Sequence, residues 1–302
     1  MKYYLILHLI VLIWGFTGIL GDRIPVSADV ITFLRTGVSF LSLILVGFFI
    51  TDKQKLNSKQ ITQLLLTGGI VGLHWFSFFY AIKVSNVSIG VVCMSSSTLF
   101  TSIIEPIAFK RKFMLSELIL SLAIIGGILI IFGFESHFYV GILSGLTAAF
   151  LAALFTVLNG RYISHISSFQ ITKYEMLGGF TVLFIFLLVG GKIQPSTFIM
   201  PLSGWINIII LGIVCTTVAF MVSVWVMKFV TPFTVSMSVN MEPIYTILIA
   251  LGIDLYSGTH KEEMSGGFYL GALIIIASIF TNAFIKKRAN KKKARLQNFA
   301  QS

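Results

Sequence analysis

The sequence has few charged residues. Asp, Glu, Lys and Arg make up 11% of its 302 residues, against about 25% in an average soluble domain. Hydrophobic residues make up 56% of the chain, which leaves too few polar groups for the solvated surface of an ordinary soluble protein. We therefore expect an integral membrane protein.

Cysteine is scarce, and so are the motifs of membrane enzymes. The two cysteines, Cys93 and Cys215, lie inside apolar stretches, which excludes a disulfide framework and predicts small, reduced core residues. The chain has no HExxH zinc motif and no GxGD protease motif, so we predict no metal and no cofactor. An intramembrane enzyme stays an alternative, since a serine could act with His74, although no nucleophile motif places the two together.

Long apolar stretches dominate the chain instead. A membrane span needs about 20 apolar residues, and ten stretches qualify: 3–20, 30–50, 62–82, 87–109, 117–134, 139–159, 170–190, 204–226, 233–253 and 267–285. The first begins next to Met1 without a convincing cleavage site, so we expect a retained helix rather than a signal peptide.

Basic residues gather in alternate connections between these spans and in the run KKRANKKKAR near the C-terminus. Lys and Arg concentrate on the cytoplasmic side of membrane proteins, so this bias predicts that both termini are cytoplasmic, in the cell membrane of a bacterium. We expect the tail to contact anionic lipid head groups. No recognition element accompanies the net charge of +11, so nucleic acid is not an expected partner.

The two halves of the chain resemble each other. AIKVSNVSIGVVCMSSST aligns with VMKFVTPFTVSMSVNMEP at an offset of 145 residues, and ITFLRTG aligns with ITKYEML at an offset of 140. Five spans per half is an odd number, so the two copies must be inverted in the membrane, as in many transporters. The predicted fold is an all-α integral membrane protein of ten transmembrane helices in two inverted five-helix repeats, 1–134 and 139–286, followed by a basic tail, 287–302.

A polar stripe marks the fourth span. Ser95, Thr98, Ser102 and Glu105 fall on one helical face, and polar groups facing lipid are costly. The stripe therefore indicates an interior lining, although serine and threonine also allow helices to pack closely.

Other polar residues can be ordered by depth. Arg35 lies about five residues, or roughly 7 Å, from the outer end of its span, where its guanidinium could snorkel outward. We expect it to lie at a different depth from Glu175 and not to contact it. The central layer is then predicted to hold Glu242 but no Lys or Arg, which favours a zwitterionic, cationic or neutral substrate over a multiply anionic one.

Two sets of candidate residues follow. The predicted substrate-binding residues are Trp14, Arg35, His74, Trp75, Ser96, Tyr174, Asn240 and Glu242. The candidates for coupling transport to an ion are Glu242, Glu105 and Glu175. Glu242 leads both, since a carboxylate near the midplane costs about 2.5–3.5 kcal/mol to insert. His74 and Asn240 could equally be hydrogen-bonding groups between helices.

Several motifs resemble the EamA family of the drug/metabolite transporter superfamily. They are WGF in the first span, the AIKVSNVS hinge, its counterpart VMKFVTPFTVSMSVNMEPIYTIL and the inverted duplication. The resemblance implies a bacterial cytoplasmic-membrane carrier that moves small metabolites such as amino acids, often outward, by alternating access. It also implies that the segments before a proline in the fourth and ninth spans line the pathway. Pro243 fits this pattern, whereas Thr98 replaces the first proline and Pro106 comes eight residues later. A channel or scramblase remains an alternative.

The predicted orientation can be tested by cysteine labelling. Single cysteines at Asn57 and Gln297 should be protected from an impermeant thiol reagent in intact cells, because both positions are predicted to be cytoplasmic. A cysteine at Ser265 should react. Rapid labelling at Gln297 would contradict the orientation.

Overall fold

The computed structural model describes residues 2–50, 52, 54–113, 115–257, 265–278, 280–281 and 284. Within these residues the chain forms helices, turns and loops, with no β-strand. The predicted basic tail, 287–302, and its expected lipid contact lie outside the described residues.

Helices occupy all ten predicted spans within the described part of the chain. Their bounds are α1 Lys2–Asp22, α2 Ala28–Gly47, α3 Ser58–Val84, α4 Val87–Met94, α5 Ser97–Ala108, α6 Leu115–Phe134, α7 Tyr139–Tyr162, α8 Ser168–Val189, α9 Leu202–Gly212, α10 Ala219–Val226, α11 Pro232–Val239 and α12 Glu242–Ser257. A π-helical segment, η3 (Ile213–Val218), joins α9 to α10, short 3₁₀ helices span Ser136–Phe138 and Pro195–Phe198, and a further apolar helix spans Gly266–Ser278.

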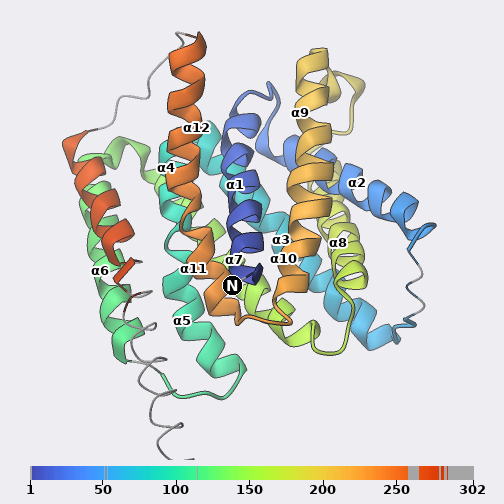
Figure 1. The fold of residues 1–302 in the computed structure, drawn as a ribbon. Coiled ribbons are helices and arrows are strands. Elements are labelled where there is room, and N and C mark those ends of the chain that lie inside the picture. The colour runs from blue at the N-terminus through green and yellow to red at the C-terminus, as the bar shows by residue number, and fades with distance from the viewer. Residues whose placement is uncertain are drawn as a thin grey trace, which may run out of the picture.

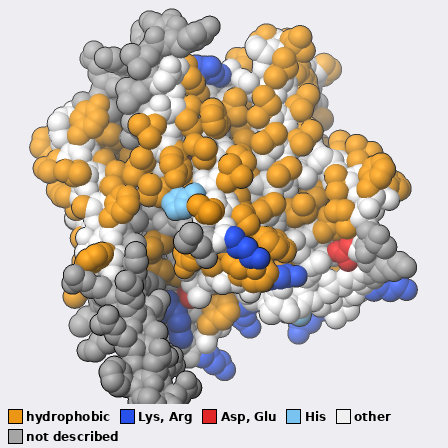
Figure 2. Space-filling view, viewed as in Figure 1, with side chains coloured by type: hydrophobic (Ala, Val, Ile, Leu, Met, Phe, Trp, Pro, Cys, Tyr) orange, Lys and Arg blue, Asp and Glu red, His pale blue; other side chains and the backbone are white. Residues whose placement is uncertain are grey.

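Seven segments of the described chain are long and apolar enough to cross a membrane. They are α1, α2, α3, α4 with α5, α7 with its preceding 3₁₀ turn, α8, and α9 through α10. Large hydrophobic side chains such as Leu5, Leu45 and Phe186 are exposed on their outer faces, and apolar side chains cover most of the face shown in Figure 2. The chain is therefore a multi-pass membrane protein.

The helices stand side by side as a bundle, with α1 between α12 and the α9–α10 segment (Figure 1). Helix α3 packs on both α7 and α8. Polar residues from this bundle are buried inside it, including Thr36, Ser39 and Asn159. The bundle therefore encloses a set of polar side chains within an otherwise apolar core, and its outside is apolar as well.

Two of the segments are broken near mid-length. Helix α4 ends at Met94 and α5 begins at Ser97, and α11 ends at Val239 before α12 begins at Glu242. Both bounds of α4 and the first residue of α5 differ from those of α11 and α12 by 145 residues, the offset seen in the sequence. Pro243 cannot donate to the carbonyl four residues back, which explains the second break. In the first break Ser96 Oγ donates to the carbonyl of Cys93 at 2.6 Å, so a serine hydroxyl competes with the helical hydrogen bonds.

Glycines bring α3 and α8 into close contact. A Cβ atom added at Gly178 would lie 2.1 Å from the carbonyl oxygen of Leu65, and one at Gly68 would lie 2.2 Å from that of Glu175. Backbone atoms cannot move aside as a flexible side chain can, so only glycine fits at these positions. This contact fixes the spacing of the helices that carry His74 and Glu175.

Enlarging this contact should destabilise the protein. We expect Gly178→Ala to lower the Tm of the detergent-purified protein, because overpacking costs about 1–3 kcal/mol. Gly126→Ala is the matched control, since a Cβ there meets nothing within 4 Å and alanine favours the helix. Equal Tm values for the two variants would show that α3 and α8 separate without cost.

Candidate functional site

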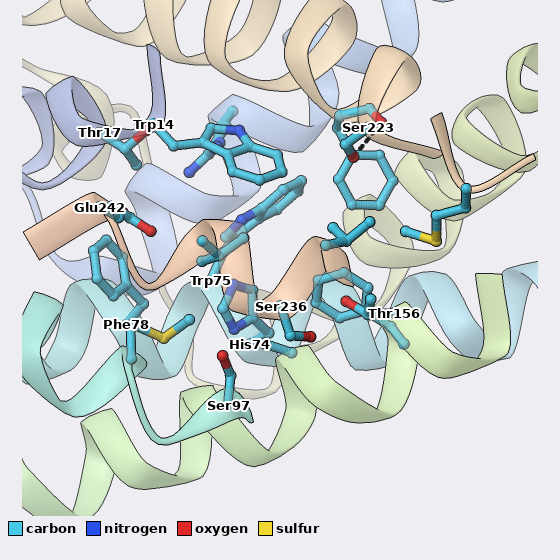
Figure 3. Close-up of a pocket in the computed structure, with 18 residues that line it drawn as sticks. Trp14, Thr17, His74, Trp75, Phe78, Ser97, Thr156, Ser223, Ser236 and Glu242 are labelled. Atoms are coloured by element: carbon cyan, nitrogen blue, oxygen red, sulfur yellow. Dashed lines mark hydrogen bonds between the residues drawn. The ribbon is translucent and has the colours of Figure 1, made fainter. Parts of the chain in front are cut away.

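A buried pocket lies at the centre of the bundle (Figure 3). Its aromatic lining consists of Trp14, Trp75, Phe78, Phe155 and Phe220. Its polar lining consists of Thr17, Arg35, His74, Ser97, Thr156, Ser223, Ser236 and Glu242. Since these residues come from both halves of the chain, any molecule in the pocket would contact both.

Arg35 is held inside this pocket and does not snorkel outward. Its side chain is 1% exposed. Its Nε donates to Thr216 Oγ1 at 2.6 Å, and Nη2 donates to the carbonyl of Cys215 at 3.4 Å. The guanidinium carbon lies 4.2 Å from the ring centroid of Trp75, a cation–π contact. The expectation that the central layer lacks a cation is therefore wrong.

One guanidinium nitrogen of Arg35 has no hydrogen-bond partner among the described residues. This atom, Nη1, is buried, whereas Nε and Nη2 are both engaged. A buried donor without a partner is costly, so Nη1 can gain from a ligand that supplies an acceptor.

The groups that hold Arg35 belong to the π-helical segment η3. Thr216 and Thr217 donate to carbonyls five residues back, those of Leu211 at 2.7 Å and Gly212 at 3.0 Å. The carbonyl of Cys215 accepts from Trp14 Nε1 at 2.9 Å as well as from Arg35. π-Helical turns often occur at functional sites. Our sequence reasoning missed this segment, although the pair Thr216–Thr217 in an apolar span was a signal for it.

Glu242 lines the same pocket from the start of α12. It is 6% exposed, and its carboxylate points into the pocket (Figure 3). No hydrogen bond or ion pair joins it to another residue in the part of the chain that the structure describes, although its charge attracts that of Arg35. The pocket thus presents an acceptor for a cationic group and a donor for an anionic one.

His74 supplies a further polar group. Its Nδ1 lies 2.8 Å from the carbonyl oxygen of Ala148, and because a carbonyl only accepts, Nδ1 carries the proton. In the neutral ring Nε2 is then an acceptor. His74 therefore joins α3 to α7 and also lines the pocket, so the structure combines the two roles left open by the sequence.

Three predicted binding residues do not line the pocket. Ser96 is buried at the α4–α5 break, where its neighbour Ser97 reaches the pocket instead. The amide of Asn240 donates to Thr98 Oγ1. Tyr174 packs against the core, with Lys173 Nζ 4.9 Å from its ring centroid. By contrast, Trp14, Arg35, His74, Trp75 and Glu242 all line it.

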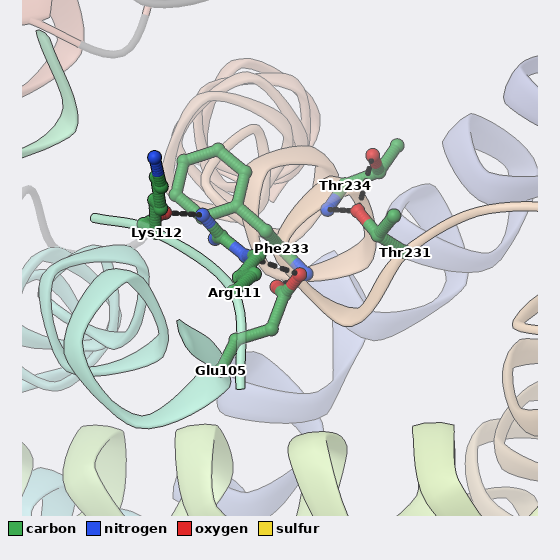
Figure 4. A network of polar contacts seen from close by, with 6 residues as sticks. All are labelled: Glu105, Arg111, Lys112, Thr231, Phe233 and Thr234. Carbon is green, nitrogen blue, oxygen red and sulfur yellow. Dashed lines mark hydrogen bonds and ion pairs between the residues drawn. The ribbon is translucent and has the colours of Figure 1, made fainter. Parts of the chain in front are cut away.

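The polar stripe of the fourth span contacts α11. Thr98 of the stripe accepts from Asn240, and Thr101, which lies outside the stripe, has its Oγ1 2.9 Å from Ser236 Oγ. Glu105 accepts from the backbone N–H of Phe233 at 2.7 Å and from Arg111 Nε at 3.3 Å (Figure 4). Phe233 lies in the first turn of α11, where backbone N–H groups need acceptors. The stripe therefore joins the two broken segments. The polar residue of this span that lines the pocket is Ser97, which is not part of the stripe.

The remaining coupling candidate, Glu175, lies outside the pocket. It is fully buried and accepts from Asn159 Nδ2 at 3.1 Å. Its partner is an amide on α7, and Arg35 bonds to the η3 segment, so the structure agrees that Arg35 and Glu175 do not pair.

Comparisons with known proteins identify the family. The model of the EamA-like transporter family matches residues 1–133 and 139–284. Two relatives come from Bacillus subtilis (strain 168). The uncharacterized transporter YdfC is 23% identical over 241 residues, covering 78% of this chain and 77% of its own. The uncharacterized transporter YoaV is 21% identical over 290 residues, covering 92% and 96%.

A solved structure, titled only as the crystal structure of a protein, shares the fold. Its TM-score is 0.68 at 15% identity, and the match covers 94% of this chain and 98% of the other. At this identity the likeness concerns the fold alone, whereas the family model covers nearly the whole sequence. The chain belongs to the EamA-like transporter family.

Proposed function

We propose that this membrane transporter is a secondary carrier that moves a small zwitterionic metabolite, such as an amino acid, across the cytoplasmic membrane by alternating access. The observation that carries the proposal is the presence of both Arg35 and Glu242 in the lining of one buried pocket. The two terminal groups of a zwitterion would match these two charges.

Charge balance favours this substrate class over the others. Burying a charge in an apolar medium is costly unless an opposite charge accompanies it. A dicarboxylate would be attracted by Arg35 but repelled by Glu242. A diamine would be attracted by Glu242 but repelled by Arg35. A zwitterion can donate its ammonium hydrogens to Glu242 while its carboxylate accepts from Nη1 of Arg35. Aromatic rings around the pocket leave room for an apolar side group.

The repeat supports alternating access. Matching breaks in α4–α5 and α11–α12 agree with the proposed inverted duplication, 1–134 and 139–286. In such carriers, broken helices from the two repeats meet at the substrate site. Here Ser97 follows one break and Glu242 follows the other, and both line the pocket.

We further propose that transport is outward and coupled to protons. The outward direction rests on the family resemblance. For coupling we favour Glu242, since a carboxyl group that holds a proton in the empty pocket could release it when an ammonium group arrives. Such an exchange would link outward substrate movement to inward proton movement.

Transport by the reconstituted protein tests the substrate class. Proteoliposomes should show saturable uptake of at least one amino acid, and little uptake of succinate or putrescine. Non-saturable flux of all solutes would indicate a channel or scramblase. Hydrolysis of a substrate without flux would favour the intramembrane enzyme.

Derivatives of the best amino acid then test each charge. The methyl ester and the N-acetyl form should compete at least about tenfold more weakly than the parent, since a hydrogen bond to a charged group contributes about 1.5–3 kcal/mol. Arg35→Gln should remove the preference for the free carboxylate, and Glu242→Gln the preference for the free amine. Arg161→Gln, which changes an exposed arginine, is the control and should retain both. A preference that survives its matching substitution would contradict the assignment.

Proton coupling gives a separate prediction for Glu242. Glu242→Gln keeps the shape of the side chain but cannot titrate, so net flux should lose its dependence on pH. Glu242→Asp should retain part of it. If Glu242→Gln transports at the wild-type rate with the wild-type pH profile, Glu242 does not couple transport.

A further inference from the structure

A second polar cluster lies between α7 and α8, apart from the central pocket. It consists of Asn159 on α7 with Thr172 and Glu175 on α8, and all three residues are 0% exposed. Thr172 and Glu175 are three residues apart on one helix, so they share a face. Asn159 is bonded to Glu175, from its Nδ2 to Glu175 Oε2, at 3.1 Å.

Each member of the cluster has an oxygen without a hydrogen-bond partner in the described part of the chain. These atoms are Asn159 Oδ1, Thr172 Oγ1 and Glu175 Oε1, all buried. Buried polar atoms are nearly always satisfied in native proteins. Three such oxygens in one cluster therefore indicate that something other than protein binds there.

The hydroxyl of Thr172 lacks a bond that several other helical threonines make. Thr36 and Thr181 donate to the carbonyl four residues back, at 2.9 Å and 2.8 Å. Thr181 is on the same helix as Thr172. Since helix geometry permits this bond and Thr172 does not make it, its hydroxyl oxygen is free to bind a ligand.

The charge of Glu175 lacks compensation. No salt bridge involves it among the described residues. The adjacent Lys173 lies over the rings of Phe169 and Tyr174, at 5.6 and 4.9 Å from their centroids. A lone carboxylate inside a membrane protein is costly and marks ion or proton pathways.

We propose that Asn159, Thr172 and Glu175 bind a dehydrated monovalent cation, Na⁺ or K⁺. Carboxylate, amide and hydroxyl oxygens suit hard cations. One carboxylate neutralises one positive charge, whereas a divalent ion would leave a buried charge. A proton on Glu175 would occupy one carboxyl oxygen, whereas a cation could accept lone pairs from the carboxylate, amide and hydroxyl oxygens together.

The cluster lies close enough to the pocket to affect it. Thr156, which lines the pocket, is one helical turn from Asn159 on α7. A cation that orders this turn could therefore link an ion gradient to the transport proposed above. Only this link rests on the proposed function, and the binding site does not.

Thermal unfolding of the detergent-purified protein tests the site without any transport assay. The Tm is measured while NaCl or KCl replaces N-methyl-D-glucamine chloride at constant ionic strength, because this organic cation is too large to enter. Binding to the folded state should raise the Tm progressively with the concentration of Na⁺ or K⁺. A Tm that is the same in all three salts overturns the proposal.

Variants locate the effect. Glu175→Gln should abolish the cation-dependent rise in Tm. Thr172→Val keeps the side-chain shape and removes only a hydroxyl that has no partner among the described residues, so the variant should fold. It should raise the Na⁺ or K⁺ concentration for half-maximal effect on the Tm at least about tenfold, as expected for loss of one ligand worth 1.4 kcal/mol or more. Thr181→Val and Glu105→Gln, a threonine on the same helix and a buried carboxylate elsewhere, should keep the wild-type response. A response that survives in both Glu175→Gln and Thr172→Val would place the cation elsewhere and overturn the assignment.

Discussion

Burial of the Arg35 guanidinium is the constraint on which the construction of the pocket depends. A cation inside an apolar bundle needs acceptors and opposite charge. Arg35 obtains them from the carbonyl of Cys215, the hydroxyl of Thr216 and the ring of Trp75. The charge of Glu242 adds a longer-range attraction. Each contribution needs its own segment in place, so one side chain fixes α2, α3, η3 and the start of α12 relative to one another.

The π-helical segment shows how local backbone geometry serves this constraint. In a regular α-helix each carbonyl accepts from the amide four residues on. In the π-helical segment η3 the carbonyl of Cys215 accepts from two side chains, Trp14 and Arg35. Thr217 extends the same contact toward α2, where Ser39 and Ser42 lie 2.9 and 2.6 Å from its hydroxyl. Two threonines and the carbonyl of Cys215 thus join η3 to α2 and α1.

The broken helices impose a second constraint. A break in a membrane helix frees backbone groups that lipid cannot satisfy. The α4–α5 and α11–α12 breaks lie together inside the bundle, tied by the Thr98–Asn240 and Thr101–Ser236 contacts. Since side chains from one segment satisfy the other, neither broken segment can shift far alone. Movement of one broken segment would therefore be transmitted to the other, as the proposed alternating access requires.

Composition and hydropathy were enough to predict the membrane class and the approximate positions of the long apolar helices, because burial in lipid demands long apolar stretches. Glu242 and Trp75 were predictable because polar or large aromatic groups near mid-membrane stand out. The role of Arg35 was not, since its depth along the helix says nothing about which way the side chain turns. The length of arginine allows it either to snorkel or to reach inward. The choice depends on Thr216 and Cys215, about 180 residues away in the sequence, and this contact leaves no local pattern.

The three buried carboxylates named as coupling candidates differ in how many partners the fold gives them. Glu105 bonds to Arg111 and to the first turn of α11, so both its charge and its position serve the structure. Glu175 has one amide partner and a free oxygen. The carboxylate of Glu242 has no hydrogen bond within the described chain and faces the pocket. A carboxylate already satisfied by the protein gains little from a ligand, whereas an unsatisfied one gains the full value of a charged hydrogen bond. The capacity to bind an external charge therefore increases from Glu105 to Glu175 to Glu242, in the order that the proposed cation and substrate sites require.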